Sequence, residues 1–389
     1  MGFLHLVWRL GGSYWLAKGV RKIIFVINNF GIGGTERHLL GLIPRLKMYF
    51  HINVFLLETG MVIEDGFDDL KLKNPKAVSS KPINRFQIIF NLSSLLLKNR
   101  SAIVHFFLPE PYIIGGITSI FFGMPNLIMS RRSLNIYQQK YKFINQIEKL
   151  LHKKMHSVVA NSNAVVNDLI SEGIATQKVK LIYNPVEACA IYGPSRRNKK
   201  RAQFGLGKND FSIVCVANLF HYKGHCDLVN ALAYVSKSLP NNWKLILVGR
   251  DGGSEKQVKE LVDRKNMNAN IMFAGELENI LEDLSIFDIG VLASHQEGFS
   301  NSVIEGMASG LPMIVTDVGG NMEAVDDQVN GLVVPAYNPI ALGNAILRLA
   351  QNRGLREEYG RAARLKALKK FTWEACIKKY IQLYNQEFK

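Results

Sequence analysis

Short apolar runs alternate with segments of helical length along the whole chain. In the first half, the runs cover residues 23–27, 52–57, 103–107, 127–129, 158–160 and 179–182. After a polar interval they resume at 211–216, 245–248, 271–273, 289–292, 313–315 and 331–334. Such runs are typical of parallel strands that are covered on both faces. The pattern predicts an α/β fold with two Rossmann-like, doubly wound domains in tandem, in which ligands bind at the carboxyl ends of the strands.

One apolar stretch is long enough to resemble a membrane span. Residues 111–130 carry no charge, and about 20 apolar residues suffice to cross a bilayer. The sequence Gly123-Met124-Pro125 interrupts the stretch, and glycine and proline are breakers of regular structure. We therefore expect a helix of about three turns followed by a buried strand at 127–130, rather than a membrane span.

Both ends of the chain are amphipathic. Residues 1–20 mix aromatic and aliphatic side chains with Arg9 and Lys18, and they lack the layout of a signal peptide, which favours a cytoplasmic location. This segment is either a membrane-interface element or a frayed leader. Near the other end, apolar residues recur at helical spacing after Thr372, a candidate N-cap.

The net charge of +16 is concentrated in the first half of the chain. Residues 1–187 contain 23 Lys and Arg against 11 Asp and Glu, whereas residues 188–389 contain 25 against 21. A basic half attracts polyanions of any kind. Because no nucleic-acid-binding motif is evident, we favour anionic lipid or a lipid phosphate over nucleic acid; a merely solvated basic surface is the alternative. Nothing in the pattern indicates an oligomeric state.

A glycine-rich segment follows the first predicted strand. Gly31, Gly33 and Gly34 precede a helical pattern, and glycines let a backbone approach an anion at the N-terminus of a helix. The dinucleotide fingerprint Gly-x-Gly-x-x-Gly fails because its last position is Glu36. The segment is either an anion-binding loop or an ordinary turn between strand and helix.

A lysine occupies a similar place in the second half. Lys223 lies between the predicted strand 211–216 and the helical pattern at 227–233. A cation near a strand end and a helix N-terminus suits a phosphate. The alternative is a solvent-exposed loop lysine.

The most informative segment is 297–312, with the sequence EGFSNSVIEGMASGLP. Ser300, Asn301 and Ser302 are all N-cap residue types, and Gly310 fits a helix end. We expect a short helix whose N-terminus can bind a pyrophosphate, with Glu297 and Glu305 accepting hydrogen bonds from sugar hydroxyls.

Both glutamates have a structural alternative. Ser302 and Glu305 have the spacing of a capping box, in which the glutamate only returns a hydrogen bond to the N-cap backbone. Glu297 is alternatively an exposed loop carboxylate. The residues alone leave these alternatives open.

Together these segments resemble the family 4 retaining glycosyltransferases, from about residue 23 to the C-terminus. The specific part is Glu297 and Glu305, separated by seven residues. Other segments match in order: NPVE at 184–187, AGELENILEDLSIFDIGVLAS at 274–294, TDVGGNMEAV at 316–325 and NGLVVP at 330–335.

The resemblance implies a GT-B fold with a cleft between its domains. Residues 1–187 would form a Rossmann-like acceptor-binding domain, and residues 188–371 would form the nucleotide-sugar-binding domain. A helix within 372–389 would cross back onto the first domain.

The resemblance also implies roles for individual residues. Lys223 would neutralise the diphosphate of a nucleotide sugar, and Glu305 would bind the ribose. Glu297 would hold the transferred sugar together with the backbone of Gly298, Phe299, Ser300, Asn301 and Ser302. Gly33 and Gly34 would close on the distal phosphate. Lys223 and Glu297 are the two residues for which a catalytic role is implied.

One position departs from the family pattern, because Asn218 stands where relatives usually have a second cation. Transition-state charge would then depend more on Lys223, the helix N-terminus and one or more of Arg131, Arg132 and Arg250. This departure puts the strength of donor binding in doubt, but not the fold.

Metal ligation is not indicated by the sequence. The four cysteines (Cys189, Cys215, Cys226 and Cys376) lack the spacing of a metal site, and we expect them to be reduced and structural. Leaving-group charge would be stabilised by fixed cations and a helix dipole. We expect no metal and no other cofactor, and retention at the anomeric carbon is implied by the family.

Three residues near predicted strand ends are candidates for contacts with the acceptor: His105, Arg131 and Arg132. A hydrogen-bonded structural role is the alternative for His105. The basic first domain fits an acceptor carrying a polyprenyl diphosphate, or the anionic membrane itself. The expected product is a surface polysaccharide or glycoconjugate, made peripherally on the inner face of the cell membrane.

Other function classes remain as alternatives. A GT-B nucleotide-sugar epimerase or phosphorylase would share the fold, and Asn218 motivates a non-catalytic glycan- or lipid-binding relative. A nicotinamide dehydrogenase is disfavoured by Glu36.

Overall fold

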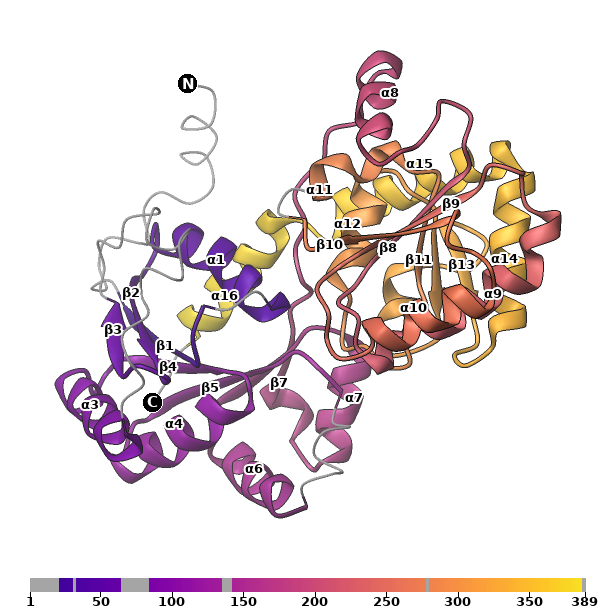
Figure 1. The fold of residues 1–389 in the computed structure, drawn as a ribbon. Helices are drawn as coiled ribbons and strands as arrows, with labels where there is room; N and C mark the ends of the chain where they lie inside the picture. The colour runs from indigo at the N-terminus through magenta and orange to yellow at the C-terminus, as the bar shows by residue number, and fades with distance from the viewer. Residues whose placement is uncertain (1–20, 31–32, 64–83, 135–141, 278–279, 387–389) are drawn as a thin grey trace, which may run out of the picture. The chain divides into compact units, whose positions relative to one another are not determined.

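A computed structural model describes residues 21–30, 33–63, 84–134, 142–277 and 280–386 (Figure 1). The chain packs as two compact units. The first contains the described residues up to Ser130, then Ile147–Val158, and then those from Ile381 onward. The second contains the described residues of Arg131–Gln146 together with Val159–Tyr380.

The first sheet has the strand order β3-β2-β1-β4-β5-β6-β7. Its strands are β1 (Lys22–Ile27), β2 (His51–Leu56), β3 (Met61–Ile63), β4 (Ile103–Phe107), β5 (Asn126–Arg131), β6 (Ser157–Ala160) and β7 (Val179–Leu181). β1 pairs in parallel with β2 and β4, and β4 with β5, whereas β3 is antiparallel to β2. The predicted strands are confirmed, and the edge strand β3 is an addition.

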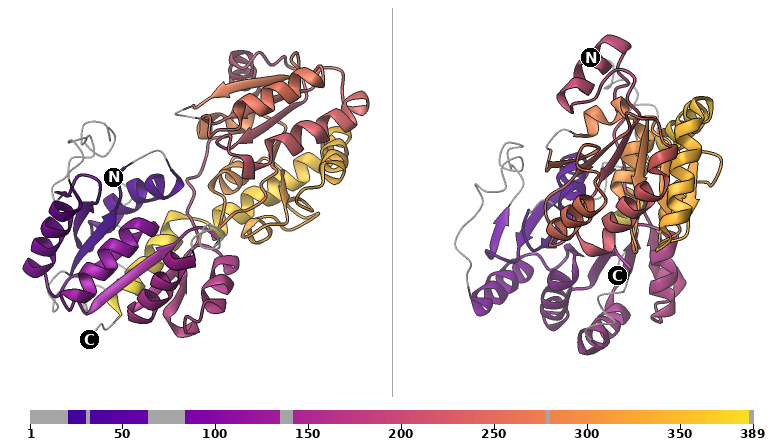
Figure 2. Two further views of the ribbon diagram at one scale, coloured as in Figure 1. Left: turned by 60° about the horizontal axis from the view of Figure 1, so that its bottom comes forward. Right: turned by 45° about the vertical axis from the view of Figure 1, so that its right-hand side comes forward.

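The helices of the first sheet are α1 (Gly34–Leu46), α3 (Arg85–Lys98), α4 (Pro109–Phe121), α6 (Lys142–Lys154) and α7 (Asn163–Ser171), with the short η3 (Thr176–Lys178). In Figures 1 and 2, α3, α4 and α6 cover one face of the sheet, and α1 lies on the other. The apolar stretch 111–130 divides into α4 and β5, as predicted. In the described ranges no helix combines the length and apolar character of a membrane span.

The second sheet has the order β10-β9-β8-β11-β12-β13. Its strands are β8 (Ser212–Val216), β9 (Lys244–Val248), β10 (Ile271–Gly275), β11 (Ile289–Leu292), β12 (Met313–Thr316) and β13 (Gly331–Val334), and every neighbouring pair is parallel. Chain order reverses between β8 and β11. In doubly wound folds, ligands bind at such a switch point, at the carboxyl ends of the strands.

The strands of the second sheet are buried on both faces, which explains their continuous apolar runs. In β8, Ile213 and Cys215 pack with α9 (His225–Val235) and α14 (Pro339–Gln351), whereas Val214 faces α12 (Asn301–Ala308) and α15 (Arg353–Lys370). The remaining helices of this unit are α8 (Pro194–Gln203), η4 (His221–Lys223), η5 (Ser236–Ser238), α10 (Glu255–Arg264), α11 (Ile280–Asp283), η6 (Leu284–Ile286) and α13 (Asn321–Ala324).

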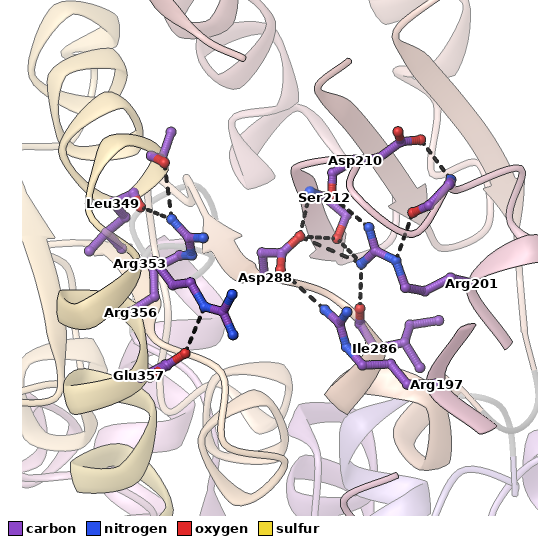
Figure 3. Close-up of polar contacts among 12 residues, drawn as sticks. Arg197, Arg201, Asp210, Ser212, Ile286, Asp288, Leu349, Arg353, Arg356 and Glu357 are labelled. Atoms are coloured by element: carbon purple, nitrogen blue, oxygen red, sulfur yellow. Dashed lines mark hydrogen bonds and ion pairs between the residues drawn. The ribbon is translucent and has the colours of Figure 1, made fainter. Parts of the chain in front are cut away.

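A buried polar cluster joins the amino ends of β8 and β11 (Figure 3). Arg201 from α8 donates to Ser212 Oγ at 2.9 Å and to the carbonyl oxygen of Ile286 at 2.7 Å. Asp288 accepts from the backbone N–H of Ser212 at 2.8 Å and lies 3.5 Å from Arg201 Nη1. The cluster joins the two paired strands between which the chain order reverses.

The last helix, α16 (Trp373–Asn385), begins in the second unit and ends in the first. Thr372 Oγ1 accepts the backbone N–H of Ala375 at 3.1 Å, so the predicted N-cap is confirmed. Near the other end of α16, the ring of Tyr384 packs against Phe25 of β1 and Phe50. The expected crossing helix is present.

Three sequence-based expectations have different outcomes. All four cysteines are free thiols, and Cys215 and Cys376 are buried. The change from the first sheet to the second falls between β7 and β8, but the compact units divide the chain elsewhere, so the boundary at residue 187 stays a prediction. Residues 1–20, with the proposed membrane-interface element, lie outside the described residues.

Candidate functional site

Lys223 and Glu297 meet at the carboxyl ends of β8 and β11. The two strands are adjacent and parallel, so the segments that follow them leave the sheet at the same edge. Lys223 Nζ donates to Glu297 Oε1 at 2.5 Å, and Ser294 Oγ donates to the same oxygen at 2.7 Å. Both side chains are mostly buried, with 17% and 9% of their surfaces exposed.

The charge of Lys223 is maintained by its partner. Burial by itself lowers the pKa of Lys223, but the Glu297 carboxylate and its hydrogen bond outweigh burial and hold the pKa above the usual lysine value. Lys223 is therefore a cation at neutral pH. An ammonium group has three N–H donors, so one can remain on Glu297 while another binds a ligand oxygen.

A neutral histidine lies beside this cation. His225, the first residue of α9, is 2% exposed. Burial, reinforced by the charge of Lys223, lowers the pKa of His225 to about 4, although a hydrogen bond with the backbone of Ala217 acts in the opposite direction. His225 therefore adds no second positive charge at neutral pH.

Glycine sets the path of the backbone around Lys223. Gly224 has a φ of +69°, and a Cβ there would collide with the carbonyl oxygen of Ala293, just after β11. A side chain at this position would be strained and would push the turn away from β11. Gly224 therefore holds Lys223 close to the segment that carries Glu297.

A second glycine turn holds Glu297. Gly319 has a φ of +52°, and a Cβ on it would collide with the carbonyl oxygen of Glu297. The N–H of Gly320 donates to the carbonyl oxygen of Gly298 at 3.0 Å. Phe299, which is 5% exposed, packs against the rings of Tyr183 and Phe371. The loop that begins at Glu297 is thus held by the Gly319–Gly320 turn and by the packing of Phe299.

The helix predicted after this loop is present as α12. Its N-cap is Ser300, which forms no side-chain capping bond to the backbone; Ser300 Oγ lies 3.1 Å from Ser302 Oγ instead. The capping box with Ser302 as N-cap is therefore wrong, because α12 begins earlier, at Asn301. Glu305 lies in the second turn of α12 and is half-buried.

The N-terminus of α12 follows Glu297 by a few residues in sequence, and Lys223 is connected to this loop by its ion pair with Glu297. Its first backbone N–H groups have no intrahelical acceptor, which makes a helix N-terminus a site for anions. Together with the Lys223 cation, this end of the sheet suits a phosphate group. Glu297 provides carboxylate oxygens for neutral hydroxyl donors.

Arg132 is tied to the same loop through Asn184 of the NPVE segment. Arg132 Nη2 donates to Asn184 Oδ1 at 2.8 Å. Asn184 Nδ2 in turn donates to Asn301 Oδ1 at 2.6 Å and to the carbonyl oxygen of Phe299 at 3.2 Å. Asn184, which is 3% exposed, was not singled out from the sequence.

Glu323 provides another connection that the sequence did not reveal. Its carboxylate accepts the backbone N–H groups of Asn163 and Ala164 at 2.9 and 3.1 Å, at the N-terminus of α7. It also accepts the hydroxyl of Tyr183 at 2.9 Å, and burial together with Glu323 raises the pKa of Tyr183. Glu323 follows Gly319 and Gly320, so it anchors their turn to α7.

Arg131, unlike Arg132, is not brought to the site. Its side chain is 2% exposed and forms an ion pair with Glu172 at 2.5 Å. A buried arginine with a carboxylate partner has its charge compensated internally. Arg131 is thus engaged by Glu172 and Arg132 adjoins the loop, and the acceptor contacts of both arginines stay predictions.

Asn218 and Arg250 lie together at the ends of β8 and β9. Asn218 Oδ1 accepts the backbone N–H of Arg250 at 3.2 Å, and Leu219 N–H donates to the carbonyl oxygen of Arg250 at 2.9 Å. Arg250 is exposed. Asn218 thus uses its side-chain oxygen to join the two strand ends.

The remaining predicted residues lie in the first unit. Gly33 is the N-cap of α1 and Gly34 its first residue; Gly31 lies outside the described residues. His105 is fully buried in β4, with Nδ1 2.7 Å from the Tyr384 hydroxyl and Nε2 2.8 Å from Ser130 Oγ. Both ring nitrogens are engaged within the unit, which agrees with the structural alternative for His105 rather than with acceptor binding.

Comparison with known proteins agrees with this arrangement. A model described as Glycosyltransferase Family 4 matches residues 32–188, and one described as Glycosyl transferases group 1 matches residues 196–366.

Individual relatives have low sequence identity to this chain but align with it over long stretches. The chain is 24% identical over 359 residues, 90% of its length and 95% of the relative's, to a Campylobacter jejuni N-acetylgalactosaminyltransferase whose name specifies a diphospho-undecaprenol-linked acceptor. An uncharacterized glycosyltransferase of Methanocaldococcus jannaschii is 27% identical over 249 residues, 63% of this chain, and the match spans only 62% of that protein.

Among solved structures, Anabaena HepE in complex with UDP superimposes with a TM-score of 0.79 at 20% identity, covering 94% of this chain and all of HepE. Such a similarity establishes the fold. The chain therefore belongs to the family 4 glycosyltransferases, enzymes with the GT-B fold of two Rossmann-like domains.

Proposed function

We propose that this enzyme transfers a hexose-type sugar, with retention of anomeric configuration, from a nucleotide diphosphate sugar to a lipid-linked or free glycan. The observation that carries the proposal is the ion pair of Lys223 and Glu297 beside the N-terminus of α12. A cation, a carboxylate and free N–H groups at a switch point are what a sugar diphosphate requires.

In this proposal the diphosphate lies at the N-terminus of α12. Lys223 donates to a phosphate oxygen while it keeps its contact with Glu297, and the N–H groups that follow Ser300 bind the distal phosphate. Glu297 accepts hydrogen bonds from the hydroxyls of the transferred sugar. Glu305, one turn further along α12, accepts those of the ribose.

The reaction needs negative charge to be stabilised on the departing nucleotide. Lys223 and the dipole of α12 lie in fixed positions, so they stabilise this charge without reorganising during the reaction. Asn218 contributes a hydrogen bond but no charge, and Arg132 and Arg250 are candidates for the missing cation. We propose that the enzyme uses no metal or other cofactor.

Uridine is the proposed base. It is supported by HepE, whose crystal structures are described as complexes with UDP and UDP-glucose. A polyprenyl diphosphate acceptor is supported by the printed name of the Campylobacter relative, which aligns over nearly its whole length. The reaction would then take place in surface glycoconjugate synthesis, on the inner face of the cell membrane.

Thermal unfolding with a panel of nucleotide sugars tests the proposal. A ligand that binds only the folded state raises the unfolding midpoint, by an amount equivalent to about 2.7 kcal/mol at a hundredfold excess over Kd. We expect UDP-sugars to produce the shift and Lys223→Ala or Glu305→Ala to abolish it. The matched controls are Lys237→Ala and Glu260→Ala, which change exposed residues of the same unit and should leave the shift intact.

Two alternatives give different outcomes with the same protein. An epimerase would convert a nucleotide sugar without any acceptor, and a non-catalytic relative would release no nucleotide with any acceptor. Binding of nucleotide sugars that survives in both site variants would contradict the assignment of Lys223 and Glu305.

A further inference from the structure

Large apolar side chains are exposed on the helices that cover one face of the first sheet. On α3, Phe86 and Phe90 are 86% and 72% exposed, and on α4 Phe121 is 82% exposed. Phe86 and Phe90 are four residues apart and therefore lie on the same side of their helix. The opposite side of α3 is buried, at Ile88 and Leu92 among others.

These helices lie side by side. α3 packs against α4, and Tyr112 of α4 forms a 2.7 Å hydrogen bond with His152 in the part of α6 that belongs to the first unit. Figures 1 and 2 show the three helices along the same face of the sheet. We call their exposed side the Phe86 face, made up of the exposed residues Phe86, Ile89, Phe90, Ile117, Phe121 and Leu150.

The exposed charges on the helices of the Phe86 face are mostly positive. Six basic residues are exposed on these helices and the turn after α3: Arg85, Lys98, Arg100, Lys149, Lys153 and Lys154. The acidic residues of the same segments within the first unit are Glu110, which is exposed, and Glu148, which is fully buried. Aromatic side chains bordered by lysine and arginine are the combination that binds the interface of anionic bilayers.

This charge pattern distinguishes a lipid surface from a second copy of the chain. A symmetric dimer through the Phe86 face would bring the basic residues around it on both copies close together, and like charges repel. An anionic headgroup layer instead attracts all six cations and accepts the phenylalanine rings below them.

We propose that the Phe86 face docks on the interface of an anionic lipid bilayer, with Phe86, Phe90 and Phe121 inserted among the headgroups. The inference rests on the proposed function in one respect, because a lipid-linked acceptor gives the enzyme a reason to be at that surface. It does not depend on which sugar is transferred.

Vesicle co-sedimentation of the full chain tests the proposal. The probes are vesicles of phosphatidylcholine alone and of phosphatidylcholine mixed with phosphatidylglycerol. We expect binding to the mixed vesicles that weakens with added salt. The triple variant Phe86→Ser, Phe90→Ser, Phe121→Ser should reduce the partition coefficient at least tenfold.

The control variant changes three exposed apolar residues of the second unit: Tyr234→Ser, Ile340→Ser and Leu365→Ser. It should bind vesicles as the wild type does. Wild-type binding by the Phe86 triple variant would overturn the proposal, and so would a wild-type dimer that the triple variant converts to a monomer.

Thermal stabilisation by nucleotide sugars separates this proposal from the proposed function. The Phe86 triple variant should keep the donor shift, because the substitutions lie outside the second unit; this also shows that the variant folds. If the wild type binds vesicles but no nucleotide sugar, the proposed function fails while the docking surface stands.

Discussion

Two ion pairs mark the opposite ends of the same two strands, and they differ in what surrounds them. At the amino ends of β8 and β11, Arg201 is closed off: besides Asp288, it donates to Gly207, Asp210, Ser212 and Ile286. At the carboxyl ends, Glu297 is the hydrogen-bond partner of the Lys223 side chain within the described part of the chain. Four of the five N–H donors of Arg201 are used within the fold, whereas the Lys223 ammonium group keeps donors that can bind a ligand.

Local backbone accounts for this difference. Arg201 comes from α8, which contacts η6 just before β11, and carbonyl oxygens of neighbouring loops converge on its guanidinium group. Lys223 follows its strand by several residues, on a turn that Gly224 holds against the end of β11. Both ion pairs therefore lie at the ends of β8 and β11, but the Arg201 pair holds the strands together, whereas the Lys223 pair can also contact a ligand.

The largest expected effect on stability comes from a change in Arg201, at the amino ends of β8 and β11. Arg201→Met roughly keeps the side-chain volume but removes the donor shared by the carbonyl oxygens of Gly207, Asp210 and Ile286, while Asp288 keeps Arg197 at 3.1 Å. We expect the free energy of unfolding to fall by about 3–5 kcal/mol, measured by urea denaturation. In Arg353→Met, which removes the exposed Arg353–Glu357 pair, the change should be no more than about 0.5 kcal/mol. Equal losses would show that the Arg201 cluster is not structural.

At the carboxyl ends of β8 and β11, a change in Lys223 should mainly lower catalytic activity. Lys223→Ala should lower kcat/KM about 10²–10³-fold, because a fixed cation at the leaving group is lost. Steady-state kinetics with an active donor and acceptor pair measure the effect, with Lys237→Ala as the control. Retention of full activity would contradict the assignment of Lys223.

The stability contributed by His225, which lies beside Lys223, should depend on pH. The pKa of His225 is lowered from 6.5 to about 4 in the folded protein, so between these values the unfolded chain binds more protons. The stabilisation from neutral His225 is therefore complete above pH 6.5 and is lost as the pH falls toward 4, by about 3 kcal/mol over the window.

Urea denaturation at several pH values between 4 and 7 measures this dependence. His225→Leu should flatten the profile relative to the wild type, because the leucine does not titrate. An unchanged slope in the variant would place the acid sensitivity elsewhere, in the carboxylates.

The smallest expected effect on stability concerns His105 in the first sheet. His105 is in β4, which neighbours β1 as β11 neighbours β8, yet it points into the core and binds Tyr384. Tyr384→Phe should lower the free energy of unfolding by about 1 kcal/mol and leave the nucleotide-sugar thermal shift unchanged. A lost shift with normal stability would instead favour a functional role for His105.

Most strands were predictable from sequence because a parallel strand covered on both faces is a continuous apolar run. β3 was not predicted, because three residues in an antiparallel edge strand carry no such signal. The helix at 300–308 was predicted, but its first residue was not fixed by residue type: Ser300, Asn301 and Ser302 are all good caps. In the structure Ser300 is the N-cap.

Some site residues were likewise predictable from sequence motifs, whereas others were shown only by the tertiary structure. Lys223 and Glu297 were identified from motifs, and their contact was predictable from the Rossmann strand order that places β8 beside β11. Asn184 and Glu323 lie in the segments NPVE and TDVGGNMEAV that resemble the family, but they act across more than 100 residues of sequence, so no local pattern reveals their partners. Arg131 and Arg132 are neighbours in sequence, but only tertiary packing shows that Glu172 engages the first and Asn184 the second.

A structure of the enzyme with a bound nucleotide sugar tests the central claim most directly. The account predicts diphosphate oxygens within roughly 3 Å of Lys223 Nζ and of the first N–H groups of α12. Density for the diphosphate elsewhere on the second unit, with the Lys223–Glu297 pair undisturbed and without a ligand contact, would contradict it.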